Sequence, residues 1–500
     1  MIASRRKMAR RWRAALGTLV VQVLALSVAM PAEAQSPPTA PETFAIGDWL
    51  FAPSLQLRTR GEYSRDPVDV GGGLDANGAN PGARVRNAGG IHERARLGLG
   101  VDKGALHAQI TLQDSRAWGA IAPTATLASP GAGLSVFGPY EAFAEARTTS
   151  SRPNWLRVGR QVVVWGDGRL LGNADWSPTP RSLDAARAHL AFGNAWDVEL
   201  LAAMLASSRP LGAAFGDTAG ALGGGSSGGV QLYGAQIAWT LDPLLKVQAF
   251  GFARVARSGA GFADLSRSFA LSTKEGETYT AALRIGGDSK GWRYGIEGAY
   301  QLGNVANFGA GGVNRTAYAA AIHVARTFDR VSLTPTVRVG GAYATGDDGS
   351  GDYKQFDPLL PDVHAFHGAM DIFAWSNIME ANARVSVVPF GTASDTAFGV
   401  EYRYAQMAQA NGEWVSGYLA SVGRTAANGS KELGHEIDAF FTYLPWTALE
   451  LHAGYSAFIA GDGARAILAS QARGSQNSDG TFSPVGLTHY GYLQATLRVP

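Results

Sequence analysis

Hydrophobic and polar side chains alternate with a period of two along most of this chain. Near the turn at residues 102–104, Arg94 and Arg96 occupy one parity of the preceding segment, and Leu97 and Leu99 occupy the other. A period of two predicts β-strands, and the short polar turn predicts a hairpin. Each repeat of the pattern is about long enough to cross a bilayer as a tilted strand. The pattern recurs in eighteen segments, at residues 52–63, 91–102, 104–116, 138–148, 154–164, 182–193, 195–207, 229–241, 244–257, 276–287, 291–303, 314–327, 330–345, 378–390, 394–408, 432–444, 447–460 and 486–499.

The connections between these segments alternate in length. Those after even-numbered segments are minimal, such as the "DKG" turn, whereas those after odd-numbered segments are long and rich in Gly, Ser, Asp and Asn, as in residues 346–377. This alternation places the short turns at one end and the long loops at the other, which is typical of an outer-membrane barrel with periplasmic turns and extracellular loops. We therefore expect an all-β, single up-and-down antiparallel barrel of eighteen strands, with its apolar face toward lipid and its polar face toward a lumen.

The N-terminus predicts export and sets the domain boundaries. A basic stretch that includes Arg5, Arg6 and Lys7 precedes an apolar run over residues 14–29, and the "AEAQ" sequence offers a cleavage site after Ala34. This pattern is typical of a secretory signal peptide. We expect a signal peptide at residues 1–34, a flexible leader at 35–50 and the barrel at 51–500. Aromatic residues near strand ends predict an interfacial girdle, with members Trp239, Tyr443, Trp446 and Tyr490.

Composition narrows the possible chemistry. The chain has no cysteine, which excludes disulfides and thiol chemistry, and only seven of its 43 basic residues are lysines. No zinc-protease, phosphate-loop or nucleophile-elbow motif is present, so we expect no enzyme, no cofactor and no nucleic-acid partner. The acidic residues 346–352 could hold a cation, although they lack the spacing of a calcium-binding loop. A solvated loop is the alternative.

Parity places charges of both signs on the expected lumen face. Rigid interior charges can build a selectivity filter, and arginine forks suit carboxylates. The alternative is cross-strand ion pairing that braces the wall. The acidic members that we expect to act in the filter are Glu297 and Glu401, and the basic members are Arg58, Arg60, Arg94, Arg96, Arg157, Arg187, Arg284, Arg338, Arg384 and Arg403.

Three stretches of the chain resemble the alginate export family of outer-membrane barrels. Residues 156–187, "LRVGRQVVVWGDGRLLGNADWSPTPRSLDAAR", resemble its G-R-Q…R-L-x-G…D-W…R-S-x-D signature, and residues 356–378 resemble its long aromatic loop. The penultimate hairpin, residues 433–458, is similar as well. The resemblance implies an arginine-rich constriction that passes a polyuronate. At the matching positions it implicates Arg116, Arg160, Gln161, Asp167, Arg169, Asp175, Arg181 and Asp184.

For Arg160, side-chain parity and the family resemblance predict different orientations. Arg157 has lumen parity and Arg160 has the opposite parity. An arginine that faces mid-bilayer lipid costs about 2–4 kcal/mol, so we expect a β-bulge before Gly159 to turn Arg160 inward. Alternatively, Arg160 lies above the hydrocarbon. It also remains open whether Arg169, Asp175 and Asp184 bind cargo or staple an extracellular plug.

The sequence thus predicts a channel for an anionic saccharide, with the 346–377 loop narrowing its mouth. A general or uptake porin for small organic acids or oligosaccharides is the alternative. Adhesion through the outward loops is a third, for which the lumen would be closed by paired charges. Expected partners are outer-membrane lipid, the saccharide cargo and periplasmic secretion proteins.

Overall fold

The fold is described by a computed structural model. It covers residues 43–68, 87–120, 134–205, 230–256, 276–305, 313–389, 396–419, 421–470, 474–476, 482–484 and 486–499. The expected signal peptide at residues 1–34 lies outside these ranges.

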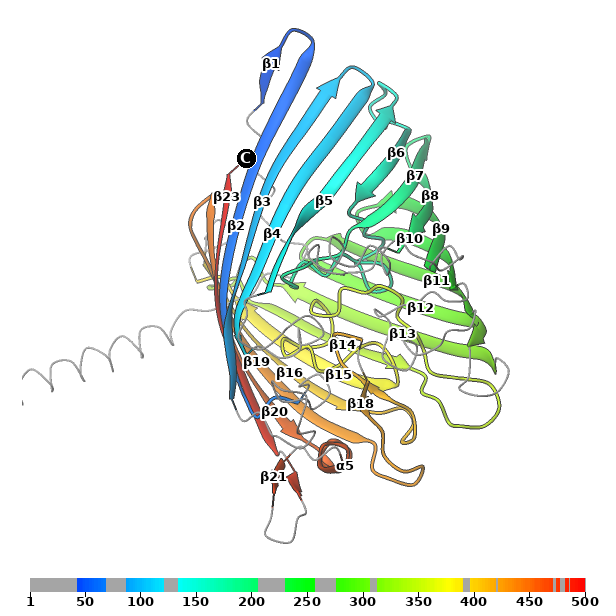
Figure 1. The fold of residues 1–500 in the computed structure, drawn as a ribbon, viewed down its shortest axis with the longest axis vertical. Coiled ribbons are helices and arrows are strands. Elements are labelled where there is room, and N and C mark those ends of the chain that lie inside the picture. Colours follow the sequence, from blue (N-terminus) through cyan, green and yellow to red (C-terminus); the bar gives the residue numbers. More distant parts are fainter. Residues whose placement is uncertain are drawn as a thin grey trace, which may run out of the picture.

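Eighteen antiparallel strands form a closed barrel (Figure 1). Each strand pairs with its neighbours in chain order, and pairing between the first and last wall strands, from Leu55↔Val499 to Arg65↔His489, closes the ring. This confirms the predicted fold. The wall strands are β2 (Trp49–Arg65), β3 (Asn87–Lys103), β4 (Leu106–Ala120), β5 (Leu134–Arg147), β6 (Trp155–Gln161), β7 (Leu183–Phe192), β8 (Trp196–Met204), β9 (Val230–Asp242), β10 (Leu245–Ala256), β11 (Gly276–Ser289), β12 (Trp292–Val305), β13 (Val313–Thr327), β14 (Thr336–Ala344), β15 (Ile378–Val387), β16 (Thr396–Gln406), β19 (Glu432–Trp446), β20 (Leu449–Ala460) and β23 (Leu487–Val499).

The outer wall is apolar and carries aromatic side chains at both ends. Leu493, midway along β23, is 72% exposed, which only an apolar surrounding makes favourable. At the short-turn end, Trp196 stacks on Trp239 and Trp446 is exposed. Tyr490 faces inward and is buried, so the prediction that it belongs to the girdle was wrong. At the long-loop end, five outward tyrosine hydroxyls meet polar side chains, in the pairs Tyr63–Asn87, Tyr233–Gln231, Tyr279–Glu277, Tyr402–His435 and Tyr455–His489.

Smaller elements decorate the two ends of the barrel. β1 (Phe44–Ile46) pairs with β2 at the short-turn end, so the hairpin begins inside the segment expected to be a leader. Helix α5 (Asp462–Ser470) and two short hairpins, β17 (Trp414–Val415) with β18 (Ser421–Gly423) and β21 (Gly474–Gln476) with β22 (Phe482–Pro484), lie toward the other end. Within the described residues, no helix has the length and apolarity needed to span a membrane.

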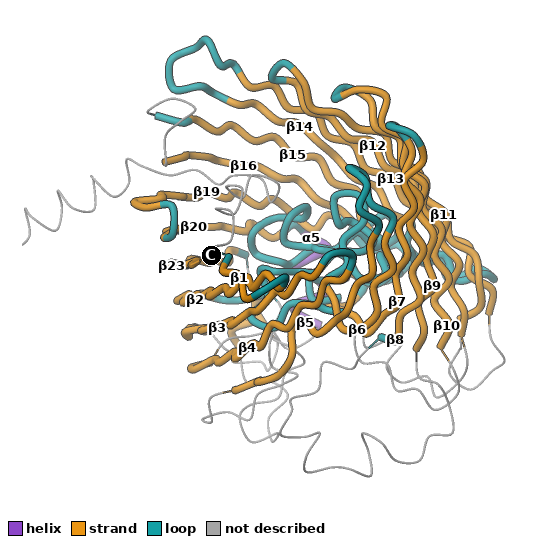
Figure 2. The backbone as a smooth tube through the Cα atoms, turned by 90° about the horizontal axis from the view of Figure 1, so that it is seen from above, coloured by secondary structure: helices purple, strands orange, loops and turns teal. Residues whose placement is uncertain are grey.

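Two long connections fold into the barrel (Figure 2). These are the 162–182 loop between β6 and β7 and the 345–377 loop between β14 and β15. Their apolar side chains join one buried cluster with inward residues of the wall, and Trp165, Leu171, Phe373 and Trp375 are among its members. The packed loops therefore fill part of the barrel interior, and some of the inward arginines contact them.

Candidate functional site

The arginine column of β2 and β3 clamps one segment of the 162–182 loop. Arg58 donates to the backbone carbonyl of Asp175 at 2.7 Å and to that of Ser177 at 2.9 Å. Arg60 donates to the carbonyl of Trp176 at 2.8 Å. These strands place the guanidinium groups on one face because alternate residues point the same way. The hydrogen-bonding groups of these arginines are thus used by the protein's own loop.

Asp175 is the carboxylate of this loop segment, and its side chain pairs with the arginines of β3. Its two oxygens accept from Arg94 at 2.9 Å and from Arg96 at 3.0 Å, and Arg58 lies 3.8 Å away. Burial disfavours the charged carboxylate, but the attraction of these three cations outweighs it and lowers the pKa of Asp175 to about 2. Asp175 is therefore ionised at neutral pH.

The Trp176 indole contacts a guanidinium group and an imidazole ring. The Arg60 guanidinium carbon lies 3.7 Å from the Trp176 ring centroid, and His364 of the 345–377 loop stacks on Trp176 at 3.9 Å with ring planes 3° apart. His364 also bonds to Asp371 within its own loop at 3.0 Å. This stack couples the wall to both inward loops.

The two loops also join through their backbones. Leu171 and Leu360 form a parallel bridge, with Gly172 donating to the Leu360 carbonyl at 2.8 Å. Arg181 donates to the carbonyls of Gly172 and Leu360 at 2.8 and 2.9 Å. The structure thus uses Arg181 to fasten one loop to the other.

Sequence reasoning missed the anchor of the 345–377 loop. Asp357 is buried and pairs with Arg254 of β10 at 2.5 Å and with Arg315 of β13 at 3.3 Å. Burial opposes its ionisation, but these two cations lower the pKa of Asp357. Asp357 stands in the aromatic-loop motif, and the lumen parity of the two arginines was the signal that could have identified the anchor.

A different arrangement lies in the short-turn half of the lumen. Arg338 of β14 and Arg384 of β15 are directly opposite each other in the register. Arg384 lies 3.9 Å from Glu401 and over the Phe440 ring at 4.5 Å. Among the described residues, no carboxylate lies within ion-pair distance of Arg338, and its Nε is buried without a hydrogen-bond partner.

Arg169 adds a further cation near this pair. It projects from the 162–182 loop over the rings of Phe366 at 4.1 Å and Trp375 at 5.2 Å. No ion pair to a carboxylate is formed by Arg169 within the described part of the chain. Arg169, Arg338 and Arg384 thus place three cations in one part of the lumen.

The remaining inward residues are matched to partners. Arg284 lies 3.5 Å from Asp167, with Glu297 opposite it on β12. Arg403 pairs with Glu380 at 2.8 Å and with Glu401 at 2.5 Å. The other matched contacts are Arg157–Glu145, Arg187–Glu199 and Gln161 with the Ala185 carbonyl. Most of the predicted lumen set therefore faces inward, and much of it braces the wall.

Three implicated residues lie on the outer wall. The register of β6 and β7 runs without a shift from Trp155↔His189 to Gln161↔Leu183, so the expected bulge before Gly159 is absent and that expectation was wrong. Arg160 keeps the parity of the exposed Val158 and pairs with Asp184 at 3.0 Å near the loop end of the strands. Arg116 likewise has outward parity and pairs with Asp114 at 2.8 Å. Such pairing lowers the cost of an arginine on a membrane protein's outer wall.

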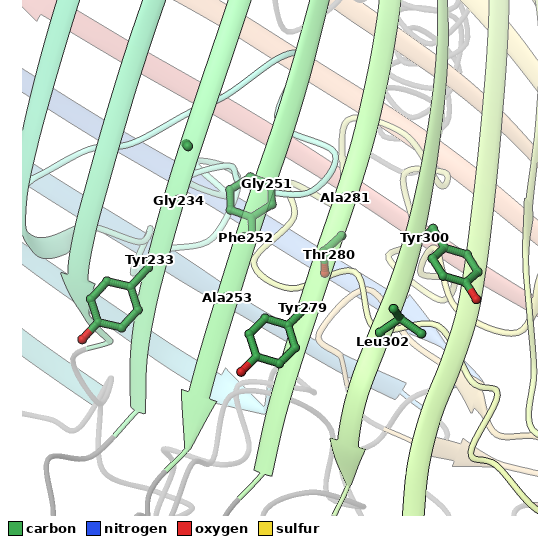
Figure 3. Close-up of a pocket in the computed structure, with 11 residues that line it drawn as sticks. Tyr233, Gly234, Gly251, Phe252, Ala253, Tyr279, Thr280, Ala281, Tyr300 and Leu302 are labelled. Atoms are coloured by element: carbon green, nitrogen blue, oxygen red, sulfur yellow. The ribbon is translucent and has the colours of Figure 1, made fainter.

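The acidic loop forms no metal site among the described residues, and the main surface groove does not open into the lumen. Asp348 in the acidic loop binds Lys354 at 2.6 Å, and within the described residues no cluster of metal-ligating side chains forms. A groove of about 470 Å³ lies on the outer wall across β9–β12 (Figure 3). Tyr233, Tyr279 and Tyr300 flank small residues there, so the groove faces lipid and not the lumen.

Comparisons with known proteins agree with this geometry. A family profile described as alginate export matches residues 54–475. Among solved structures, a BenF-like porin from Pseudomonas fluorescens Pf-5 has a TM-score of 0.54 at 10% identity, covering 90% of this chain and 98% of the porin. OccK5 of Pseudomonas aeruginosa has a TM-score of 0.52 at 11% identity, covering 90% and 98%. OccK2 of the same species, solved in complex with glucuronate, has a TM-score of 0.50 at 11% identity, covering 90% and 96%. No curated protein matches this chain.

Proposed function

The chain belongs to the alginate export family, and from that premise we propose that it passes an anionic saccharide of the polyuronate class through its lumen. The family and fold are those of an outer-membrane channel and not of an enzyme class. The cargo class and the residues that meet it are the parts proposed here. A general porin for small organic acids is the rival.

The opposed pair Arg338 and Arg384 carries the proposal. Like charges directly opposite on neighbouring strands destabilise a sheet. Here the nearest carboxylate, that of Glu401, lies 3.9 Å from Arg384 and is shared with Arg403, and no described carboxylate lies within ion-pair distance of Arg338. A carboxylate of the cargo would neutralise this surplus and accept charge-assisted hydrogen bonds from the guanidinium groups. OccK2, a barrel of related fold, was solved with glucuronate, which supports a uronate as a fitting ligand for such a lumen.

The inward loops support a selective channel over a wide pore. The 162–182 and 345–377 loops pack together inside the wall and occupy part of its cross-section, which favours a constricted path over an open one. Sites along such a path must bind weakly enough to release the cargo. The paired arginines of β2 and β3 hold the loops, whereas Arg338, which has no described carboxylate within ion-pair distance, meets the cargo together with its neighbour Arg384.

Single-channel conductance in a planar bilayer tests the proposal. We expect anion selectivity, and block by an oligomannuronate but not by a neutral oligosaccharide of equal length. Arg338→Gln should weaken the block about ten- to a hundredfold, as for loss of a charged hydrogen bond worth about 1.5–3 kcal/mol. Arg160→Gln is the matched control, since Arg160 lies on the outer wall, and should leave the block unchanged.

Two results would overturn the proposal. A large conductance, weakly selective and indifferent to both sugars, would favour the general porin. Equal block by the neutral and the charged oligomer would show that carboxylates are not what the lumen recognises.

A further inference from the structure

A cluster of aromatic side chains, separate from the Asp175 clamp and from Arg338 and Arg384, lies at the short-turn mouth. Inward side chains of β4–β7 form it: His107, Phe143, Trp155 and His189, with Arg157 among them. We call these five residues the aromatic platform. Trp155 is the first residue of β6, directly after the short connection from β5, so the platform lies at the end that faces the periplasm in barrels of this kind.

The platform is a strip of two ring pairs bridged by one guanidinium group. Trp155 and His189 are opposite in the register and stack with centroids 5.4 Å apart and planes 13° apart. Phe143 and His107 form the other pair, with ring centroids 5.8 Å apart. The Arg157 guanidinium lies over both Phe143 at 4.2 Å and Trp155 at 5.0 Å. All five side chains are half-buried, so the strip is reachable from the lumen.

The charges around the strip are balanced. Arg157 binds Glu145 at 2.7 Å, Arg152 binds Asp197 at 2.5 Å, and the remaining basic and acidic neighbours are also matched, in the contacts Arg147–Asp102, Arg187–Glu199, His107–Asp102 and His189–Asp197. No cation among the described neighbours of the strip is left without an acidic partner, unlike at Arg338. This surface is therefore suited to a ligand's apolar face and hydroxyls more than to its charge.

The indole N–H of Trp155 is available as a hydrogen-bond donor. Three buried tryptophans donate their indole N–H: Trp165 to Glu199, Trp375 to the Tyr343 carbonyl and Trp414 to the Ile372 carbonyl. Trp155 makes no such bond to any described residue, although its ring is only half-exposed. An aromatic ring with a free donor at its edge is a common arrangement where one side of a ligand is apolar and the other polar.

A pyranose ring has this dual character, because its C–H groups form an apolar face and its hydroxyls surround the edge. We propose that the aromatic platform is a saccharide-stacking subsite at the short-turn mouth, which binds pyranose rings by their C–H faces and through the Trp155 N–H. This deepens the proposed function and rests on it. The platform would recognise the sugar ring whatever its charge, whereas Arg338 and Arg384 would recognise the carboxylate.

Direct binding to the full-length protein in detergent, measured by titration calorimetry, tests the platform. The probes are an oligomannuronate and a neutral mannose oligomer of equal length. We expect Trp155→Ala to weaken binding of both by about three- to tenfold, the range expected for one aromatic contact. Trp155→Phe, which keeps a ring but removes the N–H, should lose less. Trp196→Ala, at the same mouth but on the outer wall, should bind as the unaltered protein does.

The outcomes separate the two proposals. Unchanged binding in Trp155→Ala, or no binding of either oligomer to the unaltered protein, overturns the platform and leaves the arginine-dependent block to be judged on its own. Ring-dependent binding of both sugars without any uronate-specific block would instead overturn the polyuronate channel and keep the platform. Trp155→Phe guards against a result caused by misfolding, because it keeps an aromatic ring at this position.

Discussion

At the scale of the residue, the position of a charge in this lumen decides whether it is structural or free to bind. Arg94 and Arg96 share Asp175, and their other contacts include backbone carbonyls and glutamine side chains. Buried charges are tolerated when they are paired and hydrogen-bonded. Arg338 has the same parity on its own strand but lacks such partners among the described residues. Sequence parity cannot distinguish these two situations.

The clamp around Asp175 should resist acid over most of the pH scale. The pKa of Asp175 is about 2 in the folded protein against an ordinary value of 3.8. A carboxyl with a lowered pKa contributes stability that is complete above its ordinary value and lost as the pH falls through its folded value. We expect a constant conductance from pH 8 to about 4, and a rise below about pH 3 as the loop detaches. Planar-bilayer recordings at graded pH measure this.

Asp175→Asn provides the comparison for that experiment. Its conductance should already be raised at pH 7, because three arginines lose their carboxylate. It should also lack the acid-dependent step. An acid step of equal size in both proteins would assign the transition to another carboxyl, and a closed, unaltered Asp175→Asn channel would contradict the clamp.

At the scale of the element, the strands were predictable, whereas the contacts that place the inward loops were not. Alternation located every wall strand because one face meets lipid and the other meets the lumen. The errors lie at ends with local causes. The segment expected at 330–345 forms a strand only from Thr336, since Leu333 and Thr334 adopt positive φ angles of 69° and 42°. β6 ends at Gln161, where the chain turns into the lumen.

The placement of the loops depends on contacts between residues far apart in the chain. Arg58 reaches the backbone of Asp175, and Asp357 is held by Arg254 and Arg315. A pattern with a period of two contains no information about such pairs. The family motif marked the loop residues as important, but not whether they bind cargo or the wall.

The junction of the two loops gives a prediction at this scale. A Cβ at Gly172 would lie 2.8 Å from the Gly168 carbonyl and 2.9 Å from the backbone nitrogen of Asp362. Gly172→Val should therefore force the 162–182 and 345–377 loops apart and raise the single-channel conductance. Gly251→Val is the matched control, since nothing lies within 4 Å of a Cβ there. Equal conductance in the two variants would mean that the loops do not obstruct the pore.

At the scale of the whole molecule, the barrel is arranged as two mouths around a packed middle. The long-loop end carries the five hydrogen-bonded outward tyrosines and α5, and the short-turn end carries Trp196, Trp446 and the aromatic platform. Closure between β2 and β23 leaves no unpaired edge in the wall, as a bilayer requires. The C-terminal strand thus completes the ring and contributes to the lipid-facing surface at the same time.

That double role makes β23 the place to test membrane insertion. Leu493 lies midway along the strand and points outward, so Leu493→Arg should destabilise the folded protein in liposomes by about 2–4 kcal/mol, the cost of an arginine at mid-bilayer. Val499→Arg, outward at the short-turn end of the same strand, should cost only about 0–1 kcal/mol. Denaturant titration of both variants measures the difference. Similar costs at the two positions would mean that depth in the membrane does not follow the strand as the closed barrel requires.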